Sequence, residues 1–380
     1  MTCIRGKKTF GKQAAVFKEK NPSIITPKFP TGIKSLDAAL GGGFIPGLTI
    51  IGALSGLGKT TLLTQIASNY AMSGIEVLYV TLEMTLNQLV AKTISCQSYI
   101  YGGKKVAFSS MDLRDIDFLE TMKKDVARNQ YHYDCCKYIE EKLQNLTCVE
   151  PEDGLWTVTE IRKCVQEGWI DQGLPAPIIM IDYLQLMPFE NSHESDEVKI
   201  LGTITENLKK MGNDFGTPVV AISSINRASY NEAIGMQAFK GSGNIEFNSD
   251  TLIGIQLRGV GTSGFNTETA KNKEIRNVEL KIIKSREGHA GAIVPLDYCA
   301  EFNYFSEAVV NDRKQTQENT KQKKAEKTKV NKKTKDNTTS KKQGNPPAED
   351  KTSEPEAVEL SQKPATDPRF TEAEIMDFFY

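Results

Sequence analysis

The feature that most constrains this chain is a glycine-rich turn between an apolar run and a helix-like segment. The run 48–52 (LTIIG) leads into residues 53–60, which read Ala-Leu-Ser-Gly-Leu-Gly-Lys-Thr. Glycines let several backbone N–H groups point at one anion, and the N-terminus of a following helix adds positive potential. Lys59 would add a mobile charge, and the Thr60 hydroxyl could hold Mg²⁺. The segment predicts a phosphate-binding loop, with Ala53 where the first glycine usually stands.

An ATP site built on this loop would use backbone groups and side chains from both of its ends. Its expected nucleotide-contacting residues are Ser55, Gly56, Gly58, Lys59, Thr60, Thr61 and Asp182. Asp182 is included because the apolar run 178–181 (IIMI) ends in this carboxylate, as a strand does beside a phosphate loop. With Thr60 it would hold Mg²⁺, although an aspartate can also simply begin a turn.

A second carboxylate, Glu83, follows the apolar run 77–82 (VLYVTL). Ligands bind at the carboxyl edge of open α/β sheets, and hydrolysis needs a group that orients water near the γ-phosphate. Glu83 is therefore the candidate catalytic base. The alternative is a helix-capping glutamate, because a helical pattern follows it.

The short apolar runs predict an α/β fold with a mostly parallel sheet covered by helices on both faces. Helix-like segments separate the first four runs, and the glycine-rich last two predict a hairpin at the end of the sheet. Residues 111–173 have a helical pattern. The runs are 48–51, 77–82, 178–181, 219–222, 251–257 and 278–283.

We expect this core to span residues 28–310, after a basic N-terminal segment, 1–27, that could form a linker helix. Beyond the core the composition changes. Residues 311–345 carry twelve basic and four acidic side chains, a charge of +8, and residues 346–380 carry three basic and nine acidic ones, a charge of −6. Such segments bury too little apolar surface to fold, so 311–368 is predicted to be a disordered linker. It could be a solubilising spacer or a nucleic-acid tether.

The last twelve residues, 369–380, differ from the linker. Thr371 and Glu374 fit a capping box, and Phe370 with Ile375 fits a hydrophobic staple. This pattern predicts a short amphipathic peptide. It could dock on a replication or loader protein, or fold back on the core.

The seven cysteines are odd in number and include no C-x-x-C spacing, which indicates reduced thiols. No apolar run approaches the roughly 20 residues that span a bilayer. We therefore expect a cytoplasmic protein without a membrane partner.

Lys284 and Arg286 follow the last apolar run, one residue apart. Side chains at this spacing on an extended segment point the same way. They could cover a phosphate bound by a neighbouring subunit, as an arginine finger does, or be solvated surface charges.

Read in order, several segments resemble the RecA-like motor domain of the DnaB-type replicative helicase family. The resemblance covers roughly residues 28–306. It rests on 29–37 (FPTGIKSLD), 41–47 (GGGFIPG), the phosphate loop, 82–84 (LEM), 181–187 (IDYLQLM), 223–227 (SSINR), 241–246 (GSGNIE), 284–288 (KSREG) and 294–296 (VPL).

The resemblance implies a hexameric ring that hydrolyses ATP between subunits and moves on single-stranded DNA. Lys59 and Glu83 would then be catalytic within one subunit, and Lys284 and Arg286 would act on the next subunit's nucleotide. The residues near the DNA would be Arg227, Lys240, Gly241 and Gly243.

The sequence departs from the family pattern at three points, and two of them, Ser224 and the short N-terminal segment, leave a second function open. Ser224 stands where the family has a γ-phosphate-sensing glutamine, and Gly241 occupies a usually acidic position. Only about 27 residues precede the core, too few for the N-terminal helical domain that faces primase. The alternative is a RecA-like ATPase that does not unwind DNA and acts as a loader, recombination mediator or regulator.

Overall fold

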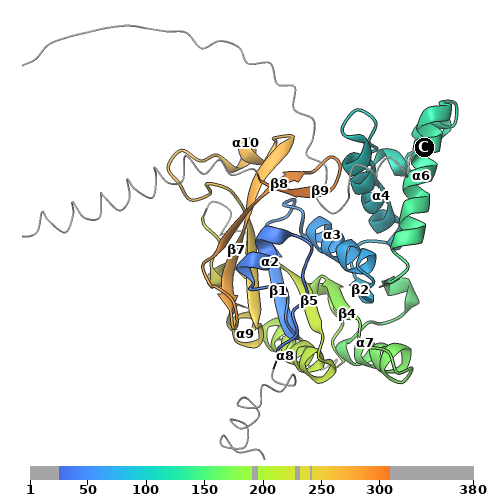
Figure 1. Cartoon of the computed structure of the whole chain (residues 1–380). Helices are drawn as coiled ribbons and strands as arrows, with labels where there is room; N and C mark the ends of the chain where they lie inside the picture. Colours follow the sequence, from blue (N-terminus) through green and yellow to red (C-terminus); the bar gives the residue numbers. More distant parts are fainter. Residues whose placement is uncertain (1–24, 191–195, 227–231, 240–241, 309–380) are drawn as a thin grey trace, which may run out of the picture. The chain divides into compact units, whose positions relative to one another are not determined.

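The computed structural model describes residues 25–190, 196–226, 232–239 and 242–308 (Figure 1). The chain divides into two units at Ala308. The predicted linker, the C-terminal peptide and most of the N-terminal segment lie outside the described residues, so these predictions remain untested.

A single nine-stranded sheet organises the described core, in the order β3-β2-β4-β5-β1-β6-β7-β8-β9. The strands from β3 to β6 in this order pair in parallel, and β6 to β9 pair antiparallel. Their bounds are β1 Gly47–Ala53, β2 Val77–Thr81, β3 Leu146–Val149, β4 Ile178–Asp182, β5 Pro218–Ser224, β6 Thr251–Leu257, β7 Ile275–Ser285, β8 Ile293–Cys299 and β9 Tyr304–Glu307.

Helices connect the parallel strands, so that the chain returns to the same edge of the sheet after each strand (Figure 1). Their bounds are α2 Lys34–Ala39, α3 Lys59–Met72, α4 Leu86–Gly102, α5 Ile116–Met122, α6 Val126–Lys142, α7 Val158–Val165, α8 Glu197–Phe215, α9 Ser242–Asn248 and α10 Thr267–Lys271. Single turns occur at Asp112–Arg114, Pro151–Asp153, Gln166–Ile170, Leu184–Leu186 and Met236–Ala238.

Two apolar clusters lie on the two faces of the sheet. Ile51 of β1 belongs to the cluster that includes Leu63 and Ile66 of α3. Its neighbour Ile50 belongs to the other cluster, with Leu208 of α8. Adjacent strand residues point to opposite faces, so these assignments place helices on both faces, as predicted.

The predicted strand runs and the terminal hairpin are confirmed, because β6 and β7 pair antiparallel. The helical prediction for 111–173 is partly wrong, since this range contains β3, which pairs with β2. Only four residues long and incompletely buried at the sheet edge, β3 has too little apolar alternation to be read from the sequence. None of the described helices is long and apolar enough to cross a membrane.

Helix α8 offers a test of the packing on one face of the sheet. Leu208 is fully buried, and Leu208→Ala should lower the free energy of unfolding by about 2–5 kcal/mol through lost burial and a cavity. Val198 of the same helix is 53% exposed, so Val198→Ala should change it by less than about 1 kcal/mol. Urea unfolding of both variants measures the difference. Equal losses would contradict the assigned face of α8.

Candidate functional site

The phosphate loop connects the carboxyl end of β1 to the first turn of α3. Helix α3 begins at Lys59, and Gly58, which precedes it, has a positive φ of 83°. Gly56 has a φ of 81°, also in the left-handed region that favours glycine. The Arg276 side chain on β7 donates to the Gly56 carbonyl at 2.7 Å. The loop therefore has the curled backbone and anchored position that anion binding requires.

A cavity of about 540 Å³ opens beside this loop. It is lined by residues from the loop and the start of α3, from the carboxyl ends of β2, β4 and β5, and by one residue each from α4 and β8. The lining comprises Ala53, Ser55, Gly56, Gly58, Lys59, Thr60, Thr61, Glu83, Met84, Lys92, Tyr183, Ser224, Ile225 and Tyr298. All the predicted loop contacts thus meet in one cavity with the candidate base.

Parallel register brings the two candidate carboxylates to the same edge. Thr81 at the end of β2 pairs with Asp182 at the end of β4. The next residue, Leu82, donates its backbone N–H to the Asp182 carbonyl at 2.7 Å. Glu83 follows directly and is exposed to the cavity. The two carboxylates therefore occupy adjacent strand ends, but only Glu83 is accessible.

Asp182 is 1% exposed, and burial raises the pKa of its carboxyl group. A hydrogen bond from Thr60 opposes this shift of the pKa, as does one from the Tyr79 hydroxyl, which lies 3.2 Å from Oδ2. A buried carboxylate beside a threonine hydroxyl presents the hard oxygen ligands that Mg²⁺ prefers. The residues present therefore fit the predicted magnesium site, with the remaining ligands left to phosphate and water.

Lys59 reaches back across the loop, and its Nζ donates to the Ala53 carbonyl at 3.1 Å. Burial lowers the pKa of its ammonium, while Asp182 and Glu83 oppose this shift of the pKa. A phosphate in the cavity would supply a further negative charge near this partly buried cation.

Sequence reasoning missed a second lysine in the cavity wall. Lys92 lies on α4, and its Nζ donates to Asn303 Oδ1 at 2.8 Å. Burial lowers the pKa of this ammonium as well. The available signal was a single lysine within the otherwise uncharged stretch 89–98 (LVAKTISCQS), downstream of Glu83.

Lys284 and Arg286 lie away from this cavity, at the opposite edge of the sheet. In the antiparallel pair β6–β7, Leu252 at the start of β6 is opposite Lys284. At this same end of β6, Thr251 pairs with Thr49 near the start of β1. The phosphate loop instead follows Ala53, the last residue of β1. Four residues of strand separate the two edges by roughly 13 Å, before the loop and the end of β7 add to the distance. The fold therefore directs both cations away from the phosphate loop of their own chain.

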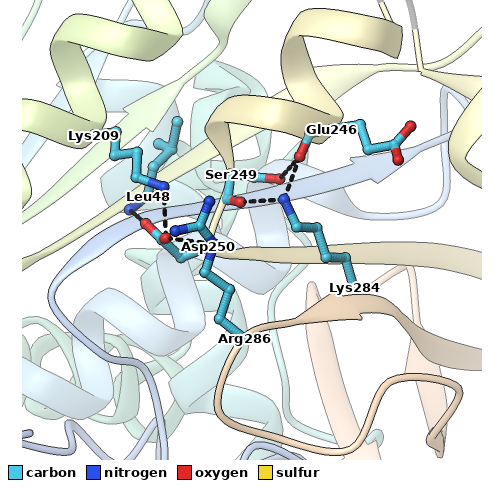
Figure 2. Close-up of polar contacts among 7 residues, drawn as sticks. All are labelled: Leu48, Lys209, Glu246, Ser249, Asp250, Lys284 and Arg286. Atoms are coloured by element: carbon cyan, nitrogen blue, oxygen red, sulfur yellow. Dashed lines mark hydrogen bonds and ion pairs between the residues drawn. The ribbon is translucent and has the colours of Figure 1, made fainter.

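Both cations contact the last turn of α9 or the two residues that follow this helix (Figure 2). Lys284 Nζ donates to the carbonyls of Glu246 and Ser249, the latter at 2.7 Å. Arg286 Nε lies 3.2 Å from Asp250 Oδ1. Lys284 is thus bound to carbonyl groups near the end of α9, whereas 52% of the Arg286 side chain stays exposed.

The predicted DNA contacts are only partly described. Gly243 lies in the first turn of α9, and the position where a side chain would begin is open space. Arg227, Lys240 and Gly241 lie outside the described residues.

The sequence matches the family described as the DnaB-like helicase C terminal domain over residues 29–307. This chain belongs to that family. The matched range agrees with the span of the resemblance and contains the cavity as well as Lys284 and Arg286.

Relatives and solved structures support the same assignment. A probable replicative DNA helicase of Trieres chinensis is 24% identical over 299 residues, covering 78% of this chain and 60% of the relative. A replicative DNA helicase DnaB of Pasteurella multocida is 26% identical over 307 residues, covering 80% of this chain and 60% of the relative. The chain therefore spans little more than half of these relatives.

Among solved structures, a DnaB-like replicative helicase studied for its interactions with primase is similar in fold. It has a TM-score of 0.62 and 20% identity, over 79% of this chain and 67% of that one. A structure described as an ATPase domain has the same TM-score and 19% identity, over 78% of this chain and 98% of that one. Both confirm the RecA-like fold predicted from the motifs.

Ser224, at the position predicted from the resemblance to sense the γ-phosphate, lies at the end of β5 in the cavity wall of this DnaB-like chain. Gln185 holds this strand end, because its amide accepts from the Ser224 backbone N–H at 3.1 Å and donates to Ser223 Oγ at 2.8 Å. A serine is shorter than the glutamine of the family. Gln185 therefore fixes the backbone position of Ser224. A water molecule would be needed to connect the short Ser224 side chain to a γ-phosphate.

Two loop glycines provide a matched test of this DnaB-like site. A Cβ at Gly58 would lie 2.8 Å from the Phe305 and Tyr298 rings, whereas at Gly56 nothing lies within 4 Å. Both alanine variants would incur roughly 1–2 kcal/mol for the left-handed backbone. Gly58→Ala should lose about 1–3 kcal/mol more through overpacking, as measured by urea unfolding. Equal destabilisation would contradict the close packing of Gly58.

Proposed function

We propose that this chain is the ATP-hydrolysing motor of a hexameric ring that translocates on single-stranded DNA and unwinds duplex DNA in replication. The observation that carries the proposal is the division of the site between two edges of one sheet. The phosphate loop and Glu83 line one cavity at the carboxyl edge, and Asp182 is buried at the adjacent end of β4. Arg286 lies at the opposite edge, half exposed. Residues 28–310 form this motor.

ATP would bind with its phosphates against the loop amides and Lys59. Thr60 and Asp182 would hold Mg²⁺, which on binding neutralises phosphate charge and aligns the β- and γ-phosphates. Ser55, Gly56, Gly58 and Thr61 would contribute the remaining contacts. Tyr79 would keep Asp182 oriented through its 3.2 Å hydrogen bond.

Hydrolysis in this arrangement depends mainly on positioning and charge. Glu83, exposed in the cavity, would accept a hydrogen bond from the attacking water and orient it in line with the bond that breaks. Lys59 and a neighbour's Arg286 would stabilise the negative charge on the transferring phosphoryl group. Lys284 was expected beside Arg286 in this role, and its ammonium would first have to leave the carbonyls that it contacts.

A site completed by a neighbour requires a head-to-tail interface, which closes into a ring when the rotation per subunit divides a full turn. The cavity and Arg286 lie at opposite edges of the sheet, which suits such an interface. The family membership supports six subunits.

Complementation between two inactive variants tests the shared site. Lys59→Ala and Arg286→Ala should each lower kcat for ATP by about 10³-fold or more, because each removes transition-state charge stabilisation. Mixed and reassembled at equal amounts, they should recover about a quarter of wild-type ATPase, since an active interface needs an intact loop and an intact Arg286 from different subunits. Mixtures as inactive as their components, or a normally active Arg286→Ala, would contradict the assignment of Arg286.

Single-stranded DNA would lie against the residues that lead into α9. Gly243 offers an open backbone in the first turn of this helix. Arg227, Lys240 and Gly241 would supply further contacts to phosphates, which need backbone N–H groups and cations but no base reading. The peptide 369–380 would bind a replication or loader protein. The six cysteines of the described residues are free, which with the family membership supports a cytoplasmic location.

Salt dependence tests the assignment of Lys240. Lys240→Ala should weaken binding to oligo-dT and reduce the slope of log K against log salt by about 0.7, as expected for one lost contact to a single strand. The exposed Lys142 at the end of α6 provides a control, and Lys142→Ala should leave the slope unchanged. Fluorescence anisotropy at several salt concentrations measures the slopes. Equal slopes for Lys240→Ala and wild type would remove Lys240 from the DNA site.

Ser224 favours a second candidate, an ATPase that binds DNA without unwinding it. Its side chain is too short to replace the family's glutamine directly, so hydrolysis and strand movement could be uncoupled. A fork-unwinding assay separates the two candidates. Strand displacement supports the helicase, whereas DNA-stimulated hydrolysis without displacement supports a loader, recombination mediator or regulator.

A further inference from the structure

Asp250 is the second of the two residues between α9 and β6, and its contacts connect segments that are distant in the sequence (Figure 2). Its carboxylate accepts from the Leu48 backbone N–H at 3.0 Å through Oδ2. Oδ1 accepts from Lys209 Nζ on α8 at 2.7 Å. Its own backbone N–H donates to the Leu48 carbonyl at 2.7 Å. Asp250 is thus fixed to β1 and α8 by side chain and backbone together.

The space around this carboxylate is closed. Asp250 is 6% exposed, and a Cβ added to Gly47 would collide with its Oδ2. Gly47 also has a φ of 112°, which disfavours any side chain there. The carboxylate therefore has little freedom to move, as a residue that orients another side chain requires.

Arg286 is held by Asp250 at two points. Its backbone N–H donates to the Asp250 carbonyl at 3.1 Å. Its Nε lies 3.2 Å from Oδ1. A contact through Nε restrains the direction of the planar guanidinium, while the exposed half of the side chain remains accessible to an anion.

We propose that Asp250 is a positioning residue that aims Arg286 at the phosphate bound by the neighbouring subunit. This inference rests on the proposed role of Arg286 and adds the group that orients it. A side chain as long as arginine loses substantial conformational freedom when it engages an anion. The contacts of Asp250 with the backbone and Nε of Arg286 already restrict this side chain, so less conformational entropy is lost when it binds the neighbour's nucleotide.

The charges around Asp250 suit an orienting role better than a neutralising one. Its single negative charge faces two cations, Lys209 and Arg286, so the cluster keeps a net positive charge. Burial lowers the pKa of Lys284, and the nearby positive charges of Arg286 and Lys209 lower it further. The cluster thus remains attractive to a phosphate while Arg286 is held in direction.

A double-mutant cycle on the full chain distinguishes positioning from general structural support. Asp250→Asn should lower kcat for ATP hydrolysis by about 10- to 100-fold, the loss expected from a misplaced catalytic group, with the KM for ATP within about 3-fold of wild type. On an Arg286→Ala background, Asp250→Asn should lower kcat no further. Non-additivity of this kind is expected only if Asp250 acts through Arg286.

Two further variants keep the test interpretable if Asp250→Asn folds poorly. Lys209→Met removes the other cation and should keep kcat within about 3-fold of wild type, because Asp250 still holds Arg286. The variant with Asp250→Asn and Lys209→Met together avoids leaving Lys209 without its carboxylate, and it should show the same loss of kcat as Asp250→Asn.

The outcomes distinguish the positioning role of Asp250 from the proposed role of Arg286. Equal losses of kcat from Asp250→Asn in the wild-type and Arg286→Ala backgrounds would show a structural role and overturn the inference. Unchanged kcat in the Asp250→Asn variants, with Arg286→Ala impaired, would also overturn it while the role of Arg286 stands. Normal hydrolysis by Arg286→Ala itself would overturn the role of Arg286 first, and this inference with it.

Discussion

The parallel pairing of β2, β4, β5 and β1 is the constraint on which the rest of the structure depends. Because parallel strands end at the same edge, hydrogen bonding between backbones brings Glu83, Ser224 and the phosphate loop to one cavity, with Asp182 buried at the neighbouring strand end. No contact between these side chains is needed to assemble them. The two apolar clusters on the faces of the sheet stabilise this register, because a slip of one residue would move every side chain of the strand to the other face.

The same sheet explains why the proposed site would need a second subunit. Strand β7 runs antiparallel to β6, so its end delivers Lys284 and Arg286 to the edge where the parallel strands begin. In the proposed function, a single chain would therefore carry two half-sites at opposite edges of the sheet. Asp250 sits at this second edge, tied to the start of β1, whose other end leads into the phosphate loop. The two half-sites are thus joined by one rigid strand within each subunit.

Much of this arrangement could be predicted from the sequence because its signals are local. Glycines at 56 and 58, a lysine after them and carboxylates at the ends of apolar runs each follow from the chemistry of adjacent residues. The positions of Lys92 in the cavity wall and of Asp250 beside Arg286 could not be predicted in this way. Their roles come from neighbours distant in the chain, Asn303 for Lys92 and Leu48 for Asp250. The edge strand β3 was missed for a related reason, since only its pairing with β2 identifies it.

The central claim is that ATP is hydrolysed between subunits. The most direct measurement is the mass of the assembly that the full chain forms with Mg²⁺, a non-hydrolysable ATP analogue and a single-stranded oligonucleotide. The account predicts a ring of six 42.1 kDa chains, in which each cavity meets the Arg286 of a neighbour. A 42.1 kDa monomer under these conditions would contradict it.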